Sequence, residues 1–169
     1  MKNNKKKTGQ KKQKAGTIQI TSNQKRVKLD RAGLRRDIRK ILELLGTGQR
    51  ELSLLVVDDE GIRTINRDYL RRDRATNVIS FSLTEGDFGD VNPDVLGDVV
   101  VSVETAAREA RTAGIPIEDA ILYLILHGIL HLAGYDHEGP KGIARARILF
   151  AVQEAVFFEI RGYRLDFRL

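Results

Sequence analysis

The sequence predicts an α+β fold, in which one domain holds a four-stranded mixed sheet packed with about five helices around a buried central helix. With 169 residues, the chain has the length of one ordinary domain and can bury a sizeable core. Short segments typical of strands alternate with longer segments that carry apolar residues at helical spacing. Residues 117–133 are apolar on nearly every side, which is typical of a helix buried at the centre of a fold.

Four segments have the composition of strands. Residues 17–21 alternate polar and apolar side chains, which indicates a half-buried strand. The other three segments are rich in residues that favour sheets, and they span 52–57, 77–83 and 97–101. Between the last two strands, residues 84–96 are acidic and contain two glycines and Pro93, which predicts a loop too polar to pack.

Five segments fit helices, and several have start or stop residues at their ends. Asp30 and Ser102 are suited to cap the first turn of a helix, and Gly46 and Gly114 suit the turn that ends one. Pro116 suits the first turn of the apolar central helix. The predicted helices span about 31–45, 59–70, 103–113, 117–133 and 142–160.

Three of these helices have an apolar side that we expect to face the core. In the first helix this side holds Leu34, Ile38, Ile41, Leu42 and Leu45. The second helix, opened by Asp58 or Asp59, bears Ile62, Ile65 and Tyr69 and is followed by the charged connection 71–74. The last helix bears five large apolar residues: Ile148, Phe150, Val152, Val156 and Phe157.

The positive charge of the chain is concentrated at its amino terminus. Residues 1–16 hold seven lysines and no acidic residue, so the remaining residues sum to −1 although the whole chain carries +6. A segment of this composition is too polar to order itself, so we predict a disordered lysine-rich tail over 1–16 ahead of a folded domain over 17–169. The tail could bind nucleic-acid phosphates or be a solvated extension, and its composition favours neither.

The composition also indicates the cellular compartment in which the protein works. Cysteine is absent, so no disulfide points to an oxidising environment. No run approaches the roughly 18 apolar residues of a membrane span, and the amino terminus lacks the apolar run of a signal peptide. These observations predict a cytoplasmic protein with no membrane partner.

All three histidines of the chain fall within residues 127–137. His127 and His131 are four residues apart, so on a helix they share one face with their Cβ atoms about 6 Å apart. Gly134 suits the end of that helix, and the chain can then return His137 toward the other two. A pair of histidines at this spacing can be chance or packing, but a third behind a glycine turn favours a metal site.

Zinc is the ion that this set of ligands favours, at one ion per chain, because imidazole suits zinc and no thiolate selects a softer metal. Three histidines leave the fourth coordination position of zinc open to water, as in catalytic sites. A structural site would need a fourth protein ligand, such as Asp136 or Glu138, and is the less favoured alternative. The predicted metal ligands are His127, His131 and His137.

The spacing His-x-x-x-His-x-x-Gly-x-x-His is also that of the metzincin proteases. Those enzymes need a glutamate directly after the first histidine to take a proton from water, and here that residue is Gly128. A protease would therefore lack its general base. Glycine in the middle of a helix costs about 1 kcal/mol relative to alanine, so we expect another part of the fold, in preference to substrate, to pack closely there.

The histidine segment resembles the signature of the YbeY family, bacterial endoribonucleases of ribosomal RNA maturation. Its pattern, His-Gly-x-Leu-His-Leu-x-Gly-Tyr-Asp-His, matches residues 127–137. The resemblance covers Leu52 to the carboxyl terminus, and the matching residues outside the histidine segment are Ile65, Asn66, Tyr69, Asp73, Thr76–Phe81 and Leu96–Val99.

The resemblance implies a single-strand-specific endoribonuclease that binds zinc through its three histidines. It also implies action at the 3′ end of small-subunit rRNA and in ribosome quality control, with single-stranded RNA, the small ribosomal subunit and its assembly factors as partners. Many members carry an arginine directly after the residue that matches Tyr69, and this arginine is implicated in catalysis. Here that position is Leu70, so the resemblance makes Arg71 the candidate catalytic residue, with a solvated charge run as the alternative.

Several assignments stay open at this level. Asp98 and Asp136 are candidates for accepting a proton or, preferably, for orienting a metal-binding histidine. Two other functions also remain: a non-catalytic zinc-containing ribosome assembly factor, and a metal-dependent hydrolase of another substrate.

Overall fold

The computed structural model describes residues 14–83, 92–136, 142–165 and 167. This part of the chain forms five helices and four strands. In chain order they are β1 (Ile18–Ser22), α1 (Arg31–Leu44), β2 (Glu51–Val57), α2 (Asp59–Leu70), β3 (Val78–Ser82), β4 (Val95–Ser102), α3 (Val103–Ala113), α4 (Ile117–Leu132) and α5 (Gly142–Arg161).

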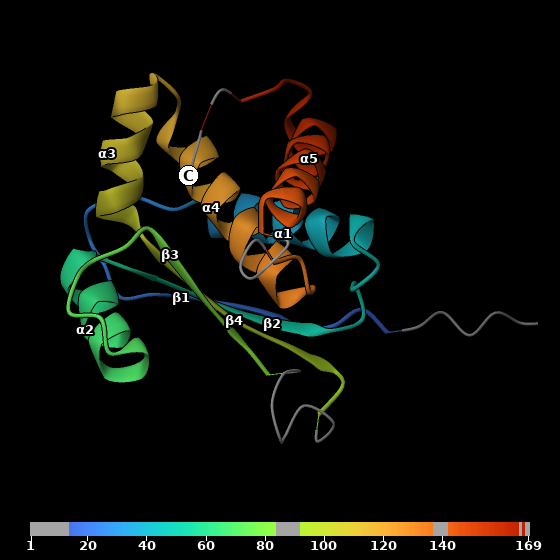
Figure 1. The fold of residues 1–169 in the computed structure, drawn as a ribbon, viewed down its shortest axis with the longest axis horizontal. Helices are drawn as coiled ribbons and strands as arrows, with labels where there is room; N and C mark the ends of the chain where they lie inside the picture. Colours follow the sequence, from blue (N-terminus) through green and yellow to red (C-terminus); the bar gives the residue numbers. More distant parts are fainter. Residues whose placement is uncertain (1–13, 84–91, 137–141, 166, 168–169) are drawn as a thin grey trace, which may run out of the picture.

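The sheet has the strand order β1-β2-β4-β3 and is mixed, as predicted. Strand β1 pairs with β2 in parallel, β2 pairs with β4 in parallel, and β3 runs antiparallel to β4 at the edge. Helices α1 and α4 pack on one face of the sheet, α5 packs on those two helices, and α2 lies against the other face of the sheet (Figure 1). The α+β prediction of one four-stranded sheet with five helices is therefore confirmed for the described residues.

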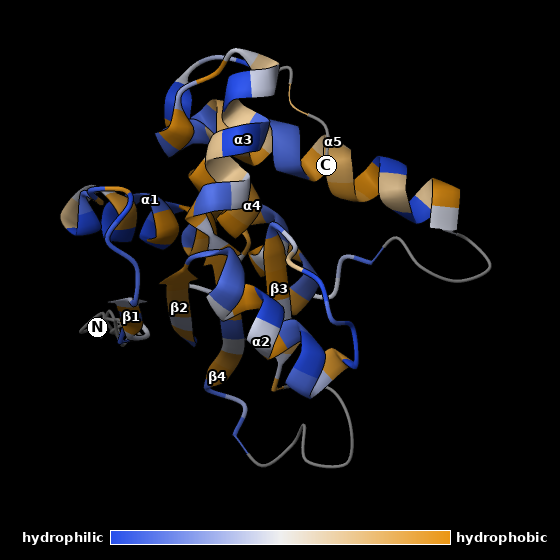
Figure 2. Cartoon of the chain, turned by 90° about the vertical axis from the view of Figure 1, so that its left-hand side faces the viewer, coloured by the Kyte–Doolittle hydropathy of each residue, from blue (hydrophilic) through white to orange (hydrophobic). Residues whose placement is uncertain are grey.

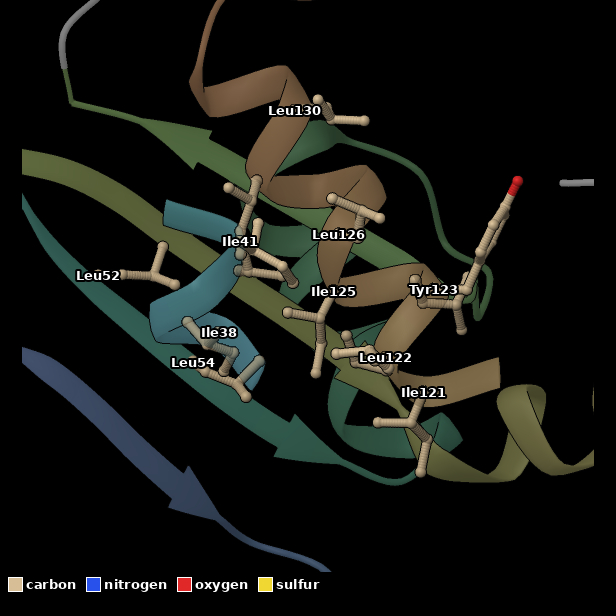
Figure 3. Close-up of a cluster of buried hydrophobic side chains, with 14 of the residues drawn as sticks. Ile38, Ile41, Leu52, Leu54, Ile121, Leu122, Tyr123, Ile125, Leu126 and Leu130 are labelled. Atoms are coloured by element: carbon tan, nitrogen blue, oxygen red, sulfur yellow. The ribbon is translucent and has the colours of Figure 1, made fainter. Parts of the chain in front are cut away.

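Helix α4 is the centre of the larger core. Every residue from Asp119 to Leu130 is buried, so the prediction of a buried central helix is confirmed. Its side chains meet those of Ile38 and Ile41 from α1 and of the sheet strand β2, as Figure 3 shows. A helix surrounded in this way holds its residues rigidly, because close-packed interiors leave little room for movement.

Local start and stop signals act as expected. The Asp30 carboxylate accepts from the backbone N–H groups at the start of α1, and the Ser102 hydroxyl accepts from that of Thr105 at the start of α3. Gly114 adopts a left-handed conformation with φ of 68° where α3 ends, and Gly134 does so with φ of 89° just after α4. These conformations cost glycine little, which is why it stands there.

Strand β4 begins at Val95, two residues earlier than the sequence suggests, so the predicted loop over 84–96 is too long at its end. Leu96 is fully buried and is an extra residue in the pairing with β2, where the register shifts. Such a bulge interrupts the alternation of a strand, and Gly97 within it has φ of 144°. The remainder of that loop, 84–91, lies outside the described residues.

Two apolar residues expected on core-facing sides are exposed. Ile148 of α5 is 58% exposed and Tyr69 of α2 is 72% exposed. Helix α5 is apolar on several sides, so its sequence does not determine which side faces the core. The buried side of α5 is set by contact with α4 and α1, and it holds Leu149, Gln153, Val156 and Phe157.

Within the described residues, no single helix is long and apolar enough to cross a membrane; α3 and α4 pass that test only together, and they bend by 116° at their junction. Most of the predicted tail, residues 1–13, lies outside the described part of the chain. At its end, the Gly16 N–H donates to the Gly48 carbonyl at 3.0 Å, so contact with the fold begins there.

Candidate metal centre and cleft

Two of the three predicted metal ligands lie together in the last two turns of α4. The Nε2 atoms of His127 and His131 are 3.1 Å apart, and their ring centres are 4.7 Å apart. His127 is buried, with 8% of its surface exposed, and His131 is partly buried. The spacing of four residues on a straight helix therefore brings the two imidazole nitrogens to one point, as predicted.

A glutamine from α5 orients His127. The Nε2 amide of Gln153 donates to the Tyr123 carbonyl at 3.1 Å, so its Oε1 is the atom that lies 3.0 Å from Nδ1 of His127. Because that oxygen only accepts, Nδ1 of His127 carries the proton and Nε2 keeps its lone pair. The ring of Phe150 stacks on His127 with 6.1 Å between ring centres.

The two imidazoles fit a shared zinc ion. Zinc–nitrogen bonds of about 2.0–2.1 Å at a tetrahedral angle place two ligand nitrogens about 3.3 Å apart. The observed separation of 3.1 Å is close to that value. Tautomer and spacing thus both suit metal binding, with the lone pair of His127 on the side of His131.

Of the remaining candidate ligands, the structure describes only Asp136. His137 and Glu138 lie outside the described residues. Over the residues that the structure describes, no three or more His, Cys, Asp or Glu side chains gather closely enough to hold a metal ion, so Asp136 does not complete a set with His127 and His131.

A cleft of about 1000 Å³ opens beside the two histidines. Its walls come from the end of α2, the segment after it, the edge strand β3, the end of α4 and the start of α5. The described residues that line it are Asn66, Leu70, Arg72, Arg74, Thr76–Ser80, Ser82, His127, Gly128, His131, Leu132, Gly134–Asp136, Gly142, Ile143, Ala146 and Phe150.

Arginines line the same cleft as the two histidines. Arg72 and Arg74 line it, and among its described lining residues Asp136 is the single carboxylate. Buried Asn66 holds the arginine segment from two sides: its carbonyl accepts from the Arg72 N–H at 3.2 Å, and its side chain donates to the Arg74 carbonyl at 2.8 Å. The cleft therefore combines two imidazoles with a positively charged wall.

Arg71, the candidate catalytic arginine, has a different place. It is the residue that ends α2, with φ of 59°, and its N–H bonds to carbonyls in the last turn of that helix. Its side chain is exposed and is not among the residues that line the cleft. The left-handed turn at Arg71 thus directs the next residue, Arg72, to the cleft.

The two aspartates considered as partners of the histidines occupy different places in the fold. Asp98 lies on β4 between Ser53 and Phe81 and does not line the cleft. Asp136 lines the cleft and lies 3.9 Å from Arg145. The hydrogen-bond partner of Nδ1 of His127 is Gln153 and not one of these aspartates. The sequence did not lead us to expect this role for Gln153. A polar residue midway between buried Leu149 and Phe157 was the available signal.

Gly128 is close to the sheet. A Cβ atom at this position would lie 2.9 Å from Cγ1 of Val99 and 3.3 Å from Cγ2 of Val78. The prediction that packing excludes a side chain here is therefore confirmed. The glutamate that a metzincin carries at this position would not fit without displacing β3 or β4.

Known proteins are similar to this chain in sequence and in fold. A profile of the family described as "Endoribonuclease YbeY" matches residues 19–161. Proteins named Endoribonuclease YbeY from Syntrophus aciditrophicus and Geobacter sulfurreducens are 50% and 51% identical to the chain, over 89% and 83% of its length and 93% of theirs. The solution structure of TM1509 from Thermotoga maritima matches with a TM-score of 0.60 and 27% identity, covering 86% of this chain and 90% of that one. Because the family profile spans the fold and both described histidines, the chain belongs to the YbeY family.

Proposed function

We propose that the protein is a zinc-dependent endoribonuclease that cuts single-stranded RNA. We further propose that it acts in the cytoplasm, in maturation of the 3′ end of small-subunit rRNA and in ribosome quality control, with the small subunit and its assembly factors as partners. The supporting observation is the convergence of His127 and His131 on one point, 3.1 Å apart, in the wall of a cleft that also holds Arg72 and Arg74. Its relatives are named endoribonucleases.

Three imidazoles would hold the metal: those of His127, His131 and His137. When bound, zinc would lower the pKa of a water molecule to near 7 and withdraw charge from a phosphoryl oxygen. The chain's own contribution is to keep the acceptor nitrogen of His127 pointed at this site, because Gln153 holds its other nitrogen as a donor. Gly128 supplies no general base next to the first histidine.

Binding and positioning of the RNA backbone fall to the arginines. A guanidinium offers paired N–H donors that match phosphate oxygens, and Arg72 and Arg74 present theirs to the cleft. Asp136 lies in the same cleft and can accept a proton from the attacking oxygen. Arg71 remains a candidate for a catalytic contact. Comparing the cleavage rates of Arg71→Ala, Arg72→Ala and Arg74→Ala distinguishes its role from those of the other two arginines.

The cleft suits a single strand. At about 1000 Å³ it has the size of a large ligand pocket, which admits a short extended segment but not a duplex. Its apolar lining residues Leu70 and Ile143 are 42% and 79% exposed, and they can contact unstacked bases. Bases that are paired in a helix present no such faces.

The proposal is tested by incubating purified protein with single-stranded and duplex fragments of small-subunit rRNA, with and without chelator. Cleavage of the single strand alone, lost with chelator and restored by zinc, is expected, and His131→Ala should show none. Holoprotein that cuts no RNA but co-sediments with small subunits would support the assembly-factor function instead. Cleavage of a peptide panel in preference to RNA would point to a hydrolase of another substrate.

A further inference from the structure

Helix α5 carries a line of apolar residues on the side turned away from the core. Its buried side packs against α4 and α1 through Leu149, Gln153, Val156 and Phe157. Half a turn around the helix, exposed residues recur at alternating spacings of four and three, the spacing of a helix–helix contact. These residues, which we call the α5 stripe, are Ala144, Ile148, Ala151, Ala155 and Phe158.

The two large members of the α5 stripe are well exposed: Ile148 by 58% and Phe158 by 46%. Single exposed apolar residues are common, but here they lie on one line with three alanines between or beside them. Figure 2 shows α5 reaching beyond the elements that it packs against, with hydrophobic residues along its length. An approaching helix would therefore meet this side of α5 unobstructed by the elements beneath it.

The shape of the α5 stripe matches a second copy of itself in the antiparallel direction. When two α5 helices cross at Ala151, residues equally far from that point face each other. Ala144 then faces Phe158 of the second copy, because each is seven residues from Ala151. Ile148 is three residues from Ala151 and Ala155 is four, so these two lie next to each other with an offset of one residue, about 1.5 Å, and the two Ala151 residues meet. Every large side chain is placed against a small one, as close helix packing requires.

Charge also matches this direction. Arg147 and Glu154 lie on the same flank of the α5 stripe, four residues before and three residues after Ala151. In an antiparallel pair related by a twofold axis, each flank meets its own copy in reverse, so Arg147 lies beside Glu154 of the second copy, twice. In a parallel pair each flank would instead meet the opposite flank of the second copy, so Arg147 would not lie beside Glu154. Glu154 also lies 3.7 Å from Arg164, but that pair is exposed and contributes little.

We infer that the α5 stripe is the contact surface of an antiparallel homodimer with Ala151 at its twofold axis. One helix pair buries less than the roughly 800 Å² per partner of a standard stable interface, so association at micromolar concentration is expected. The dimer needs no RNA or metal, so the inference is independent of the proposed function.

Sedimentation of the full chain across about 1 to 200 µM tests the dimer, since this range brackets a small interface. We expect a monomer–dimer equilibrium. Ala151→Glu places two carboxylates in contact at the axis and should leave only monomer, whereas the same change at exposed Ala32 of α1 should leave the equilibrium unchanged. Native protein that stays monomeric throughout, or equal effects of the two variants, would overturn the inference.

Charge reversal tests the antiparallel direction. Arg147→Glu and Glu154→Arg should each weaken the dimer at least about tenfold at low salt, as like charges then face each other. The double variant restores opposite charges and should recover most of the affinity. A double variant as weak as the sum of the single changes would contradict this pairing.

Because the chain has no cysteine, a single introduced thiol reports the register. Ala151→Cys should form an intermolecular disulfide on mild oxidation, since both copies meet there. Ala144→Cys should not, because the two positions would be about 21 Å apart, far beyond disulfide reach. Equal cross-linking at both positions would indicate a parallel pair and overturn the inference.

Discussion

Nδ1 of His127 lies 3.0 Å from Oε1 of Gln153, 26 residues later in the chain. The contact joins α4 and α5, two of the helices that border the cleft, and fixes which nitrogen of His127 faces His131. Because Gln153 is fully buried and its amide also donates to the Tyr123 carbonyl, it can adopt only one orientation. The tautomer of His127 therefore depends on Gln153, a residue that does not line the cleft.

Replacing this acceptor should weaken metal binding. Gln153→Leu should lower zinc affinity by about 10–100-fold, since the ring loses the partner that holds its tautomer. Gln153→Glu keeps an acceptor and should retain native affinity. Both variants lose the amide that donates to the Tyr123 carbonyl. They therefore differ only in whether residue 153 accepts a hydrogen bond from Nδ1 of His127. Competition with a fluorescent chelator measures the affinity; equal losses in both variants would contradict the role of Gln153.

Gly128 should be intolerant of even a methyl group. Gly128→Ala should lower the free energy of unfolding by roughly 1 kcal/mol, because overpacking against Val99 outweighs the gain in helix propensity. Val99→Ala makes room for that methyl group, so the double variant should be more stable than the two single losses predict. Urea unfolding of the four proteins gives the coupling, and strictly additive losses would exclude a steric cause.

The three arginines after α2 should differ in their effect on RNA cleavage. Arg72→Ala and Arg74→Ala should each lower kcat/KM by about tenfold or more, because each removes a charged hydrogen-bond donor from the cleft. Arg71→Ala should change it less, since Arg71 ends α2 outside the cleft lining. Single-turnover cleavage of a single-stranded fragment measures this. A larger loss for Arg71 would establish it as the catalytic arginine.

Asp59 should make stability depend on pH. Burial acts to raise its pKa, but hydrogen bonds donated by Ser102, Arg108 and Thr105 at 2.6–2.7 Å outweigh burial and hold the pKa below the usual 3.8. A lowered carboxyl pKa stabilises the fold above the usual pKa, and this stability is lost as pH falls through the folded value.

The matching measurement is urea unfolding of the native protein and Asp59→Asn at pH 7 and pH 3. At pH 7 the variant should be less stable by about 1–2 kcal/mol, and the difference should shrink at pH 3. Asp68→Asn, which removes only an exposed pair with its neighbour Arg67, is the control and should cost little at either pH. A loss from Asp59→Asn that does not change with pH would contradict this linkage.

Much of the fold could be predicted because its signals are local. Caps such as Asp30 and Ser102 and the glycine at 114 act within one turn, so they can be read without knowing the neighbours. The apolar central helix and its two histidines are also a matter of spacing along one helix. The features that were missed depend on contacts between elements far apart in the chain.

Gln153 and Ile148 illustrate the difference. Helix α5 is apolar on several sides, so only its contact with α4 decides that Gln153 turns inward and Ile148 outward. The early start of β4 has the same kind of cause, since the bulge at Leu96 exists only in the pairing with β2. Likewise, the turn at Arg71, not the order of the arginines, determines which of them line the cleft.

The proposed function requires that the histidines hold one zinc ion and that RNA cleavage depends on this ion. Titration of metal-free protein with zinc, with cleavage of a single-stranded rRNA fragment followed at each step, tests both points at once. We expect no cleavage without zinc, a linear rise of the cleavage rate with added zinc, and a break at one zinc per chain, with His131→Ala inactive throughout. Full cleavage by the metal-free protein, or none at one equivalent of zinc, would contradict it.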